Sequence, residues 1–351
     1  MSIFDQRSRA FGVTFLTAAA GGWIASLLHI PLAWLFGSLM AVAVANLTGF
    51  RQPAPGWSRQ IGQVIAGVAV GLSFTPALAE RLVAYSGYMV GAAMLSIIAG
   101  TLMSFVLAWV TRIDRTTAYF ASLPGGVAEM SVLADRYGGQ TALVALSQSL
   151  RVVLVVVTLP ALCSLFGWHG TVDLAQSRLP LHPPLMVLML AGAWLVAWVF
   201  GMIRVTNNWL LGGLVTGAVI GYFEIPLSRV AESVLVASQI MIGAALGSRF
   251  TRDLVLTMRR FIPATVVSTL VVITFTTILA FVFAEWIDLD VATLALALAP
   301  GGVAEMSLTA RTLHLGGAEV TAFHLVRILL VILLTAPTYE LARRWAARRG
   351  R

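Results

Sequence analysis

Charged side chains are scarce in this sequence, and lysine is missing altogether. Charged residues make up 11% of the 351 residues, and all 23 basic residues are arginine. A typical globular domain has about a quarter of its residues charged. Together with a hydrophobic content of 59% and a mean hydropathy of +0.90, this shortage excludes an ordinary soluble domain and indicates a polytopic membrane protein.

Cysteine pairs and metal-binding patterns are missing as well. The single Cys163 lies in an apolar run, which excludes a disulfide framework and is typical of an inert core cysteine. The five histidines are dispersed without the spacing of a metal site, and no nucleophile motif or phosphate loop occurs. We therefore expect neither an enzyme nor a cofactor. An oxidoreductase would require a bound metal or haem, which elemental analysis would detect.

The positive charge does not indicate a nucleic-acid partner. The formal net charge is +8 and the isoelectric point is near 10.7. The arginines lie mostly in short connections between apolar runs, whereas nucleic-acid binding proteins carry a basic stripe or patch. Membrane topology explains this distribution better, so we expect the lipid bilayer and no nucleic acid as a partner.

One stretch of the chain is present twice. The octamer PGGVAEMS at residues 124–131 recurs letter for letter at residues 300–307. The same offset of 176 residues aligns many other positions, so the chain is a duplication. We expect two repeats, at residues 1–167 and 185–351, joined by a proline-containing linker at residues 168–184.

Each repeat contains five apolar runs long enough to cross a hydrocarbon core of about 30 Å. They lie at residues 10–28, 31–49, 60–79, 83–110 and 141–166, and again at 185–203, 208–223, 231–248, 262–284 and 318–339.

The octamers interrupt two shorter apolar stretches, at residues 116–136 and 291–312. The proline ends one short helix, the glycines turn, and a second short helix follows. Each stretch is either one broken helix that crosses the membrane or a re-entrant hairpin that returns to its own side.

The arginine distribution decides between these two topologies. With re-entrant hairpins and a cytoplasmic N-terminus, 17 arginines face the cytoplasm and 4 the opposite side, whereas crossing segments give 13 and 8. The positive-inside rule favours the first arrangement. We therefore predict an all-α polytopic membrane protein of two inverted repeats, each with five transmembrane helices and a re-entrant Pro-Gly-Gly hairpin. Both termini are then cytoplasmic and residues 168–184 periplasmic.

Inverted repeats with broken helices are typical of secondary transporters, whose site lies where the half-helix ends converge. The glycine pairs Gly125-Gly126 and Gly301-Gly302 can present backbone N–H groups to an anion at a helix N-terminus. The alternative is that these glycines only allow tight helix packing.

Glu129 and Glu305 lie in the first turn after each glycine pair. An ionisable group at membrane depth is by default a functional candidate, so we expect a role in proton or cation coupling or in substrate binding. The alternative is that each carboxylate only caps free N–H groups of its own helix.

Arg151 and Arg327 lie near the middle of apolar helices, each 22 residues after its glutamate. A Glu–Arg pair would satisfy both charges. Such a pair is either a structural ion pair or a working pair in which the arginine binds an anionic group of the substrate.

Three further positions accompany these residues. Gln148 and His324 precede the arginines by three residues and so share their helix face. His324 is a candidate proton carrier, with a satisfied core histidine as the alternative. Gln63 and Gln239 start seams of small residues, Gly67-x3-Gly71 and its repeat, which predict close helix contact, and their amides are supporting candidates for the site.

Several of these motifs resemble one family of proteins. The duplicated PGGVAEM, QSLRVVLVV at residues 148–156 and PLAWLFG at residues 31–37 resemble the AbrB family of bacterial inner-membrane proteins, over essentially the whole chain. The resemblance implies a duplicated inner-membrane protein. Members carry the old labels of gene regulator and ammonia monooxygenase, which these residues do not support, since there is no helix-turn-helix and no copper or iron site.

The glycine-rich segments are also similar to those of the 2-hydroxycarboxylate and glutamate sodium symporters, which implies an elevator mechanism by analogy of architecture. The sequence thus predicts a secondary active transporter of a small anionic solute, coupled to protons or sodium. The alternative is a membrane-embedded ligand sensor that regulates gene expression without transport. A second copy of the chain is a further candidate partner.

Overall fold

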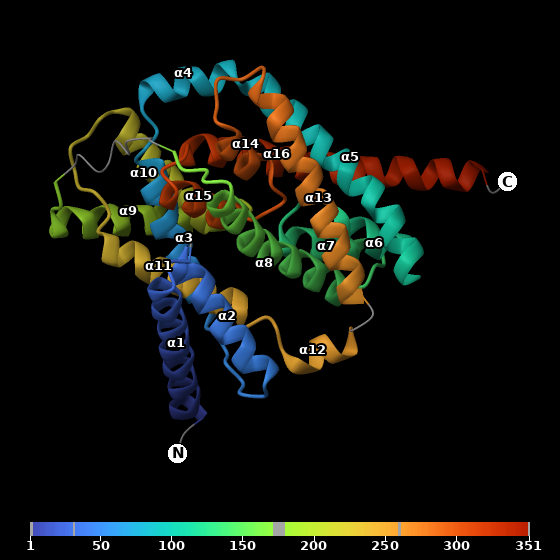
Figure 1. Ribbon diagram of the computed structural model, residues 1–351, viewed down its shortest axis with the longest axis horizontal. Helices are drawn as coiled ribbons and strands as arrows, with labels where there is room; N and C mark the ends of the chain where they lie inside the picture. The colour runs from blue at the N-terminus through green and yellow to red at the C-terminus, as the bar shows by residue number, and fades with distance from the viewer. Residues whose placement is uncertain (1–2, 31, 171–179, 259–260, 350–351) are drawn as a thin grey trace. The chain divides into compact units, whose positions relative to one another are not determined.

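The computed structural model describes residues 3–30, 32–170, 180–258 and 261–349, and within them the regular structure is entirely helical (Figure 1). Most of the predicted linker, residues 171–179, lies outside the described residues.

Sixteen helices are described, and they form two series of eight. The first series is α1 Ile3–Leu27, α2 Ala33–Leu47, α3 Gly56–Gly71, α4 Pro76–Ala84, α5 Ser86–Thr111, α6 Arg115–Ser122, α7 Val127–Arg136 and α8 Thr141–Leu165. The second is α9 Pro183–Met202, α10 Asn208–Tyr222, α11 Glu232–Gly247, α12 Arg252–Thr257, α13 Phe261–Ala284, α14 Val291–Leu298, α15 Val303–Thr312 and α16 Gly317–Arg349.

The two series repeat each other in position. Helix α3 starts at residue 56 and α11 at residue 232, while α6 and α14 start at residues 115 and 291, so both pairs are 176 residues apart. The duplication seen in the sequence therefore extends to the helix boundaries.

Six helices are long and apolar enough to cross a membrane: α1, α5, α8, α9, α13 and α16. A seventh candidate is the pair α3 and α4, which is bent by 93°. Helices α2, α10 and α11 have only 15 or 16 residues, about 23 Å of helix. Nine of the ten predicted runs are each covered by one helix, whereas the run at residues 60–79 is broken between α3 and α4. Among the described residues, six helices reach the full length of a membrane span by themselves.

The chain divides into two compact units that do not coincide with the repeats. Unit 1 comprises Met1–Arg81, Val156–Thr257 and Ala304–Ala318. Unit 2 comprises Leu82–Val155, Met258–Val303 and Glu319–Arg351. Each unit therefore takes helices from both halves of the chain, and the counterparts α7 and α15 belong to different units.

Unit 1 is held together by helices that cross at glycines. Helix α3 packs on α10 and α11, and α2 packs on α11 and α1. A Cβ atom added at Gly67 would lie 2.8 Å from the backbone nitrogen of Leu214 on α10, and one at Gly71 2.7 Å from that of Ala218. The predicted close helix contact at this seam is confirmed.

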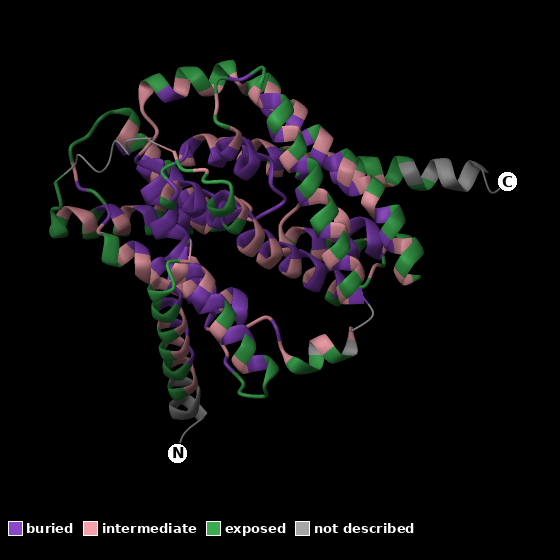
Figure 2. Cartoon of the chain, viewed as in Figure 1, coloured by how far each residue is buried: buried purple, intermediate pink, exposed green. Residues whose placement is uncertain are grey.

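Unit 2 is built around the crossing of α5 and α13. Helix α5 also packs on α6, and α13 packs on α14. Every residue of α14 from Ala292 to Leu298 is buried, which is consistent with its continuous apolar sequence (Figure 2).

Helices α6 and α7 form a hairpin around the first Pro-Gly-Gly turn. Asp114 caps α6 by accepting a hydrogen bond from the Thr117 N–H at 2.7 Å, and α6 ends at Ser122. Helix α7 starts directly after Gly126, which confirms the predicted helix break. Beyond α7, the Gln140 N–H donates to the Thr117 hydroxyl at 2.7 Å. The chain thus leaves the hairpin beside the point where it began.

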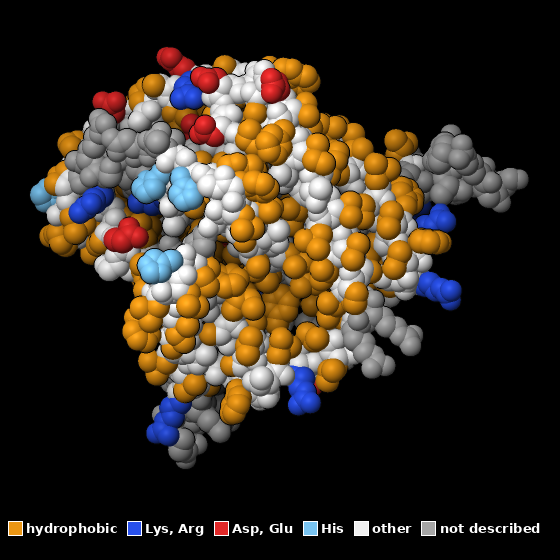
Figure 3. All heavy atoms as spheres, viewed as in Figure 1, with side chains coloured by type: hydrophobic (Ala, Val, Ile, Leu, Met, Phe, Trp, Pro, Cys, Tyr) orange, Lys and Arg blue, Asp and Glu red, His pale blue; other side chains and the backbone are white. Residues whose placement is uncertain are grey.

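Large apolar side chains cover much of the surface. Trp109 is 82% exposed and Leu16 72% exposed, although both lie on long apolar helices. Hydrophobic side chains occupy most of the face in view in Figure 3. Exposed apolar area of this extent marks a surface that contacts another apolar phase, which agrees with a multi-pass membrane protein.

Candidate functional site

A small polar pocket lies within unit 2, at the crossing of α5 and α13. It is lined by residues of α5, α6, α8 and α13 together with Pro124 and Pro300, the prolines of both octamers. The enclosed space is about 20 Å³, enough for one water-sized group. The lining includes Arg151 and seven hydroxyl side chains: Ser96, Ser122, Ser147, Thr265, Ser268, Thr269 and Thr276.

Helix α13 contributes four of the seven hydroxyl groups. Thr265, Ser268, Thr269 and Thr276 follow one another at helical spacing and therefore share one face of α13. This face is otherwise surrounded by apolar residues. A row of hydroxyls in an apolar span provides hydrogen-bond donors without a fixed charge.

Arg151 supplies the positive charge of the pocket, and the first turn holds it in place. Its Nη1 donates to the Leu123 carbonyl at 2.8 Å and its Nη2 to the Gly125 carbonyl at 3.2 Å. Nη2 also contacts Gln148 Oε1, and the Gln148 amide donates to the Phe120 and Leu123 carbonyls at 2.8 and 3.0 Å. Arg151 thus ties α8 to the Pro-Gly-Gly turn.

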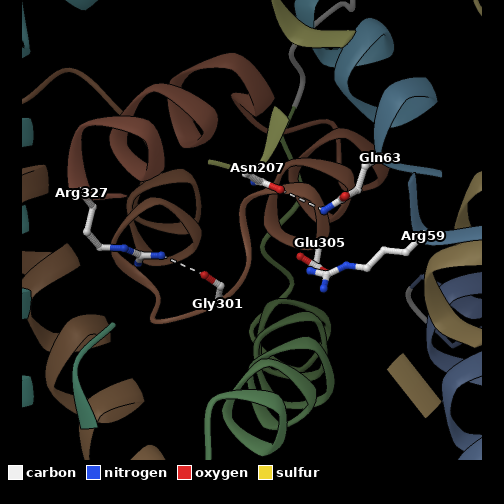
Figure 4. A network of polar contacts seen from close by, with 6 residues as sticks. All are labelled: Arg59, Gln63, Asn207, Gly301, Glu305 and Arg327. Atoms are coloured by element: carbon white, nitrogen blue, oxygen red, sulfur yellow. Dashed lines mark hydrogen bonds and ion pairs between the residues drawn. The ribbon is translucent and has the colours of Figure 1, made fainter. Parts of the chain in front are cut away.

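In the second half, Arg327 ties α16 to the second Pro-Gly-Gly turn in the same way. Its Nη2 donates to the Gly301 carbonyl at 2.8 Å, and its Nη1 donates to the Ala299 carbonyl (Figure 4). Ala299 and Gly301 are the repeat counterparts of Leu123 and Gly125. The two arginine clamps are therefore equivalent, and both were inherited through the duplication.

His324 takes the place of Gln148 in the second clamp. Its Nε2 lies 2.9 Å from the Leu296 carbonyl, so this nitrogen carries the proton. Its Nδ1 lies 2.8 Å from Arg327 Nη2 and accepts that hydrogen bond. Both ring nitrogens are thus engaged in a neutral imidazole, which favours the core histidine over the proton carrier.

The predicted Glu–Arg pairing is wrong, because the partners of these groups are different. Arg151 and Arg327 donate hydrogen bonds to backbone carbonyls of the turns. A carbonyl partner satisfies a guanidinium without the desolvation cost of burying a second charged group. Glu305 is paired with Arg59 of α3, with 3.9 Å between Oε1 and Nη2 (Figure 4). Glu129 folds back over Gly126, where its carboxylate fills the place a Cβ atom would take.

Of the glycine N–H groups expected to face an anion, that of Gly125 is used within its own turn. The Gly125 N–H donates to the Leu123 carbonyl at 2.8 Å. The carbonyls of Gly125 and Gly301 accept from the arginines. These turns thus present carbonyl acceptors that orient the arginines. Gly126, which has no side chain, leaves space for the Glu129 carboxylate. Its counterpart in the second turn, Gly302, is half-buried.

A second polar cluster lies within unit 1, around Glu305. Glu305 is 1% exposed, and its Oε1 and the Nε of Arg59 accept or donate no hydrogen bond among the described residues. Arg249, after α11, is close enough to interact electrostatically with both groups; burial, with the repulsion of Arg59, lowers the pKa of Arg249 to about 10, and Glu305 opposes that shift. The cluster therefore combines one buried carboxylate with two arginines that interact with it electrostatically.

Of the three supporting glutamines, Gln63 and Gln239 belong to unit 1, whereas Gln148 lies in unit 2 as part of the first arginine clamp. Gln63 donates from Nε2 to Asn207 Oδ1 at 3.2 Å (Figure 4). Asn207 precedes α10 with a φ of 56°, a left-handed conformation that asparagine tolerates. Gln239 is buried on α11 at the equivalent position. Of the predicted site residues, the pocket contains Arg151.

The pocket is suited to an anion. Arg151 Nε, Ser122 Oγ and Thr265 Oγ1 are buried and have no hydrogen-bond partner among the described residues. No carboxylate lines the pocket, so the guanidinium is its single formal charge. Buried donors without partners are costly, and an anion among them would satisfy all three. Among the described residues, no three His, Cys, Asp or Glu side chains are grouped as metal ligands.

A family model described as transition state regulatory protein AbrB matches residues 34–343 of the chain. The chain belongs to the AbrB family. The expected family resemblance is therefore confirmed, and it includes the regions that supply both the pocket and the arginine clamps.

Two relatives match this AbrB-family chain over most of their length. YhjN of Bacillus subtilis (strain 168) is 29% identical over 350 residues, with 92% of this chain and 91% of the relative covered. A protein of Escherichia coli (strain K12) named "Putative regulator AbrB" is 24% identical over 312 residues, with 88% and 89% covered.

Sequence reasoning missed the hydroxyl groups of this AbrB-family pocket and the Arg59–Glu305 pair. The helical spacing of the hydroxyls in α13 was a usable signal, because four of them share one face of an apolar span. The pairing of Arg59 with Glu305 had no such signal, since the two residues lie in different repeats.

Proposed function

We propose that this AbrB-family protein is a secondary active transporter of a small anionic solute, located in the bacterial inner membrane. The observation that carries the proposal is the pocket of unit 2, in which an arginine, unpartnered hydroxyls and the prolines of both octamers meet. A buried charged residue in a span marks a substrate or ion pathway. Broken helices in corresponding places of two repeats are the usual site of secondary transporters.

The proposal includes inverted repeats with re-entrant hairpins. The contact of Gln140 with Thr117, and the stacking of Tyr137 on Phe120 at 5.8 Å, support a segment that returns to its own side. With five spans and one such hairpin in each half, the second half is inverted. The arginine distribution supports this topology, in which both termini are cytoplasmic.

Alternating access is proposed to occur by movement of unit 2, which carries the pocket, in an elevator-like manner. The division of the chain into two compact units, each composed of parts of both repeats, supports this mechanism. Glu305 is the best candidate for the coupling group, because it is a buried carboxylate whose ion pair at 3.9 Å is loose. A proton or sodium ion would compete there with Arg59.

Counterflow in proteoliposomes tests the transport proposal. Purified protein, preloaded with a mixture of unlabelled small anions, should accumulate a labelled one that it recognises. Arg151→Gln should abolish this uptake, whereas Arg115→Ala, which removes an exposed arginine of α6, should preserve it. Equal uptake by the Arg151 variant and the wild type would contradict the proposal.

The second candidate function is a membrane-embedded sensor. The name of the Escherichia coli relative, which contains the word regulator, favours it. A sensor would bind the anion saturably in detergent but show no counterflow, so the same preparation separates the two candidates.

A further inference from the structure

We infer that the pocket of unit 2 accepts a compact anion with a single negative charge, namely a short carboxylate or an inorganic monoanion. This inference rests on the proposed function, since it specifies the substrate class of the same site.

The charge of the pocket fits one negative charge. Arg151 is the single charged residue of the lining, and its Nη1 and Nη2 groups donate to the carbonyls of Leu123 and Gly125. Only Nε remains without a partner. The bidentate fork that usually selects carboxylate or phosphate groups is therefore occupied. A second arginine, Arg327, is close enough to interact electrostatically with Arg151, but it does not line the pocket and donates to the Ala299 and Gly301 carbonyls. A second negative charge would therefore have no cation in direct contact to neutralise it.

The remaining donors are neutral hydroxyls. Ser122 Oγ on α6 and Thr265 Oγ1 on α13 are both buried and have no hydrogen-bond partner among the described residues. Hydroxyls stabilise an anion by hydrogen bonding, but they carry no positive charge to balance the second negative charge of a dianion. Together with Arg151 Nε, they provide three donors for one anionic group.

The narrow space inside the pocket favours a small anionic group. The space of about 20 Å³ holds a group of one or a few atoms. Gly100 of α5 limits it on one side, because a Cβ atom there would lie 3.1 Å from the Cδ of Pro124 and from the Ser122 carbonyl oxygen. Pro124, Pro300 and Val272 give the remaining wall an apolar character, which suits the methyl end of a short carboxylate.

Calorimetric titration of the detergent-purified full chain tests the inference. Formate, acetate, chloride and nitrate are the monoanion probes, and succinate and phosphate are the dianion probes, at constant ionic strength and at an alkaline pH at which phosphate is mainly the dianion. We expect at least one monoanion to bind saturably and more tightly than both dianions. Tighter binding of formate or acetate assigns a carboxylate substrate, and tighter binding of chloride or nitrate an inorganic one.

Two variants and one matched control locate the binding. Thr265→Val and Ser122→Ala should each weaken binding about ten-fold to a hundred-fold, the usual effect of losing a hydrogen bond to a charged group. Thr277→Val is the control, because Thr277 Oγ1 is also buried without a partner on α13 but does not line the pocket. It should bind like the wild type. Thermal unfolding of each variant identifies any loss that results from misfolding.

Preference for succinate or phosphate, or a loss with Thr277→Val as large as with Thr265→Val, would overturn the inference. So would the absence of saturable binding by all six anions. Saturable monoanion binding without counterflow would instead contradict the transport proposal and leave the ligand class standing, so the two failures are distinguishable.

Discussion

At the scale of single residues, the molecule depends on how two buried arginines are satisfied. Arg151 and Arg327 donate to equivalent carbonyls of two equivalent turns, through contacts that Gln148 and His324 complete. A guanidinium has five donors and no acceptor, so backbone carbonyls at a helix break are suitable partners. The arginines therefore hold the turns, and Arg151 retains one donor for the pocket.

The first clamp contains Gln148 where the second contains His324, and this difference gives the first prediction. A glutamine at position 324 can donate to the Leu296 carbonyl and accept from Arg327, as Gln148 does in the first half. His324→Gln should therefore preserve the melting temperature and leave the pH dependence of anion uptake unchanged. His324→Leu should destabilise the fold by about 1–3 kcal/mol for each partner left unsatisfied. A flattened pH profile in His324→Gln would identify His324 as a proton carrier after all.

At the scale of helices, unit 1 depends on close crossings that only glycine permits. Gly67→Ala places a methyl group 2.8 Å from the Leu214 nitrogen, and such overpacking typically costs about 1–3 kcal/mol. The control is Gly91→Ala on α5, where no atom lies within 4 Å and the higher helix propensity of alanine should give a small stabilisation. Thermal unfolding in detergent measures both, and equal melting temperatures would show that the crossing of α3 and α10 tolerates separation.

Helix capping supplies another prediction at this scale. Asp114→Ala should destabilise α6 by about 0.5–2 kcal/mol, because the aspartate caps the Thr117 N–H. The repeat counterpart, Asp290, makes no such bond, so Asp290→Ala should cost less. Burial acts to raise the pKa of Asp114, but the hydrogen bonds from Thr117 and Gln140 outweigh it and lower that pKa. Its stabilising contribution is thus present above about pH 4 and is lost as the pH falls through the lowered pKa. A larger loss for Asp290→Ala would contradict this assignment.

The long helices and the breaks at the octamers were predictable from sequence, whereas the 93° bend between α3 and α4 and the polar partners were not. Apolar run length and the Pro-Gly-Gly turn act locally, so they specified the long helices and the break between α6 and α7. The arginines of the clamps bind backbone carbonyls, which every residue has. No side-chain pattern in the sequence therefore indicates these contacts. Glutamate was the expected partner of each arginine because only side chains were considered. The pocket required the crossing of α5 and α13, and this crossing has no local signal apart from the hydroxyl face of α13.

At the scale of the whole molecule, the boundary between the two repeats and the boundaries between the two compact units lie at different places in the chain. Each unit combines parts of both repeats, so neither repeat would fold into a complete unit by itself. The pocket of unit 2 illustrates this, because Arg151 belongs to the first repeat and Thr265 to the second. Duplication thus supplied two copies of one set of helices that together form a single site.

The topology is tested by reporter fusions. With two re-entrant hairpins and inverted repeats, a reporter fused at residue 175 should be active in the periplasm, and reporters at both termini should be active in the cytoplasm. A cytoplasmic signal at residue 175 would mean that the octamer segments cross the membrane and that the repeats are parallel.

Access to the pocket from both sides of the membrane is the most direct test of the central claim. Cys163 is the single cysteine and is buried, so Cys163→Ser with Ser268→Cys places one thiol in the pocket and leaves Arg151, Ser122 and Thr265 unchanged. A membrane-impermeant thiol reagent is applied to right-side-out and to inside-out vesicles. Alternating access predicts labelling in both orientations, reduced by the monoanion that binds. Labelling from one side alone, unaffected by that anion, would contradict transport through this pocket.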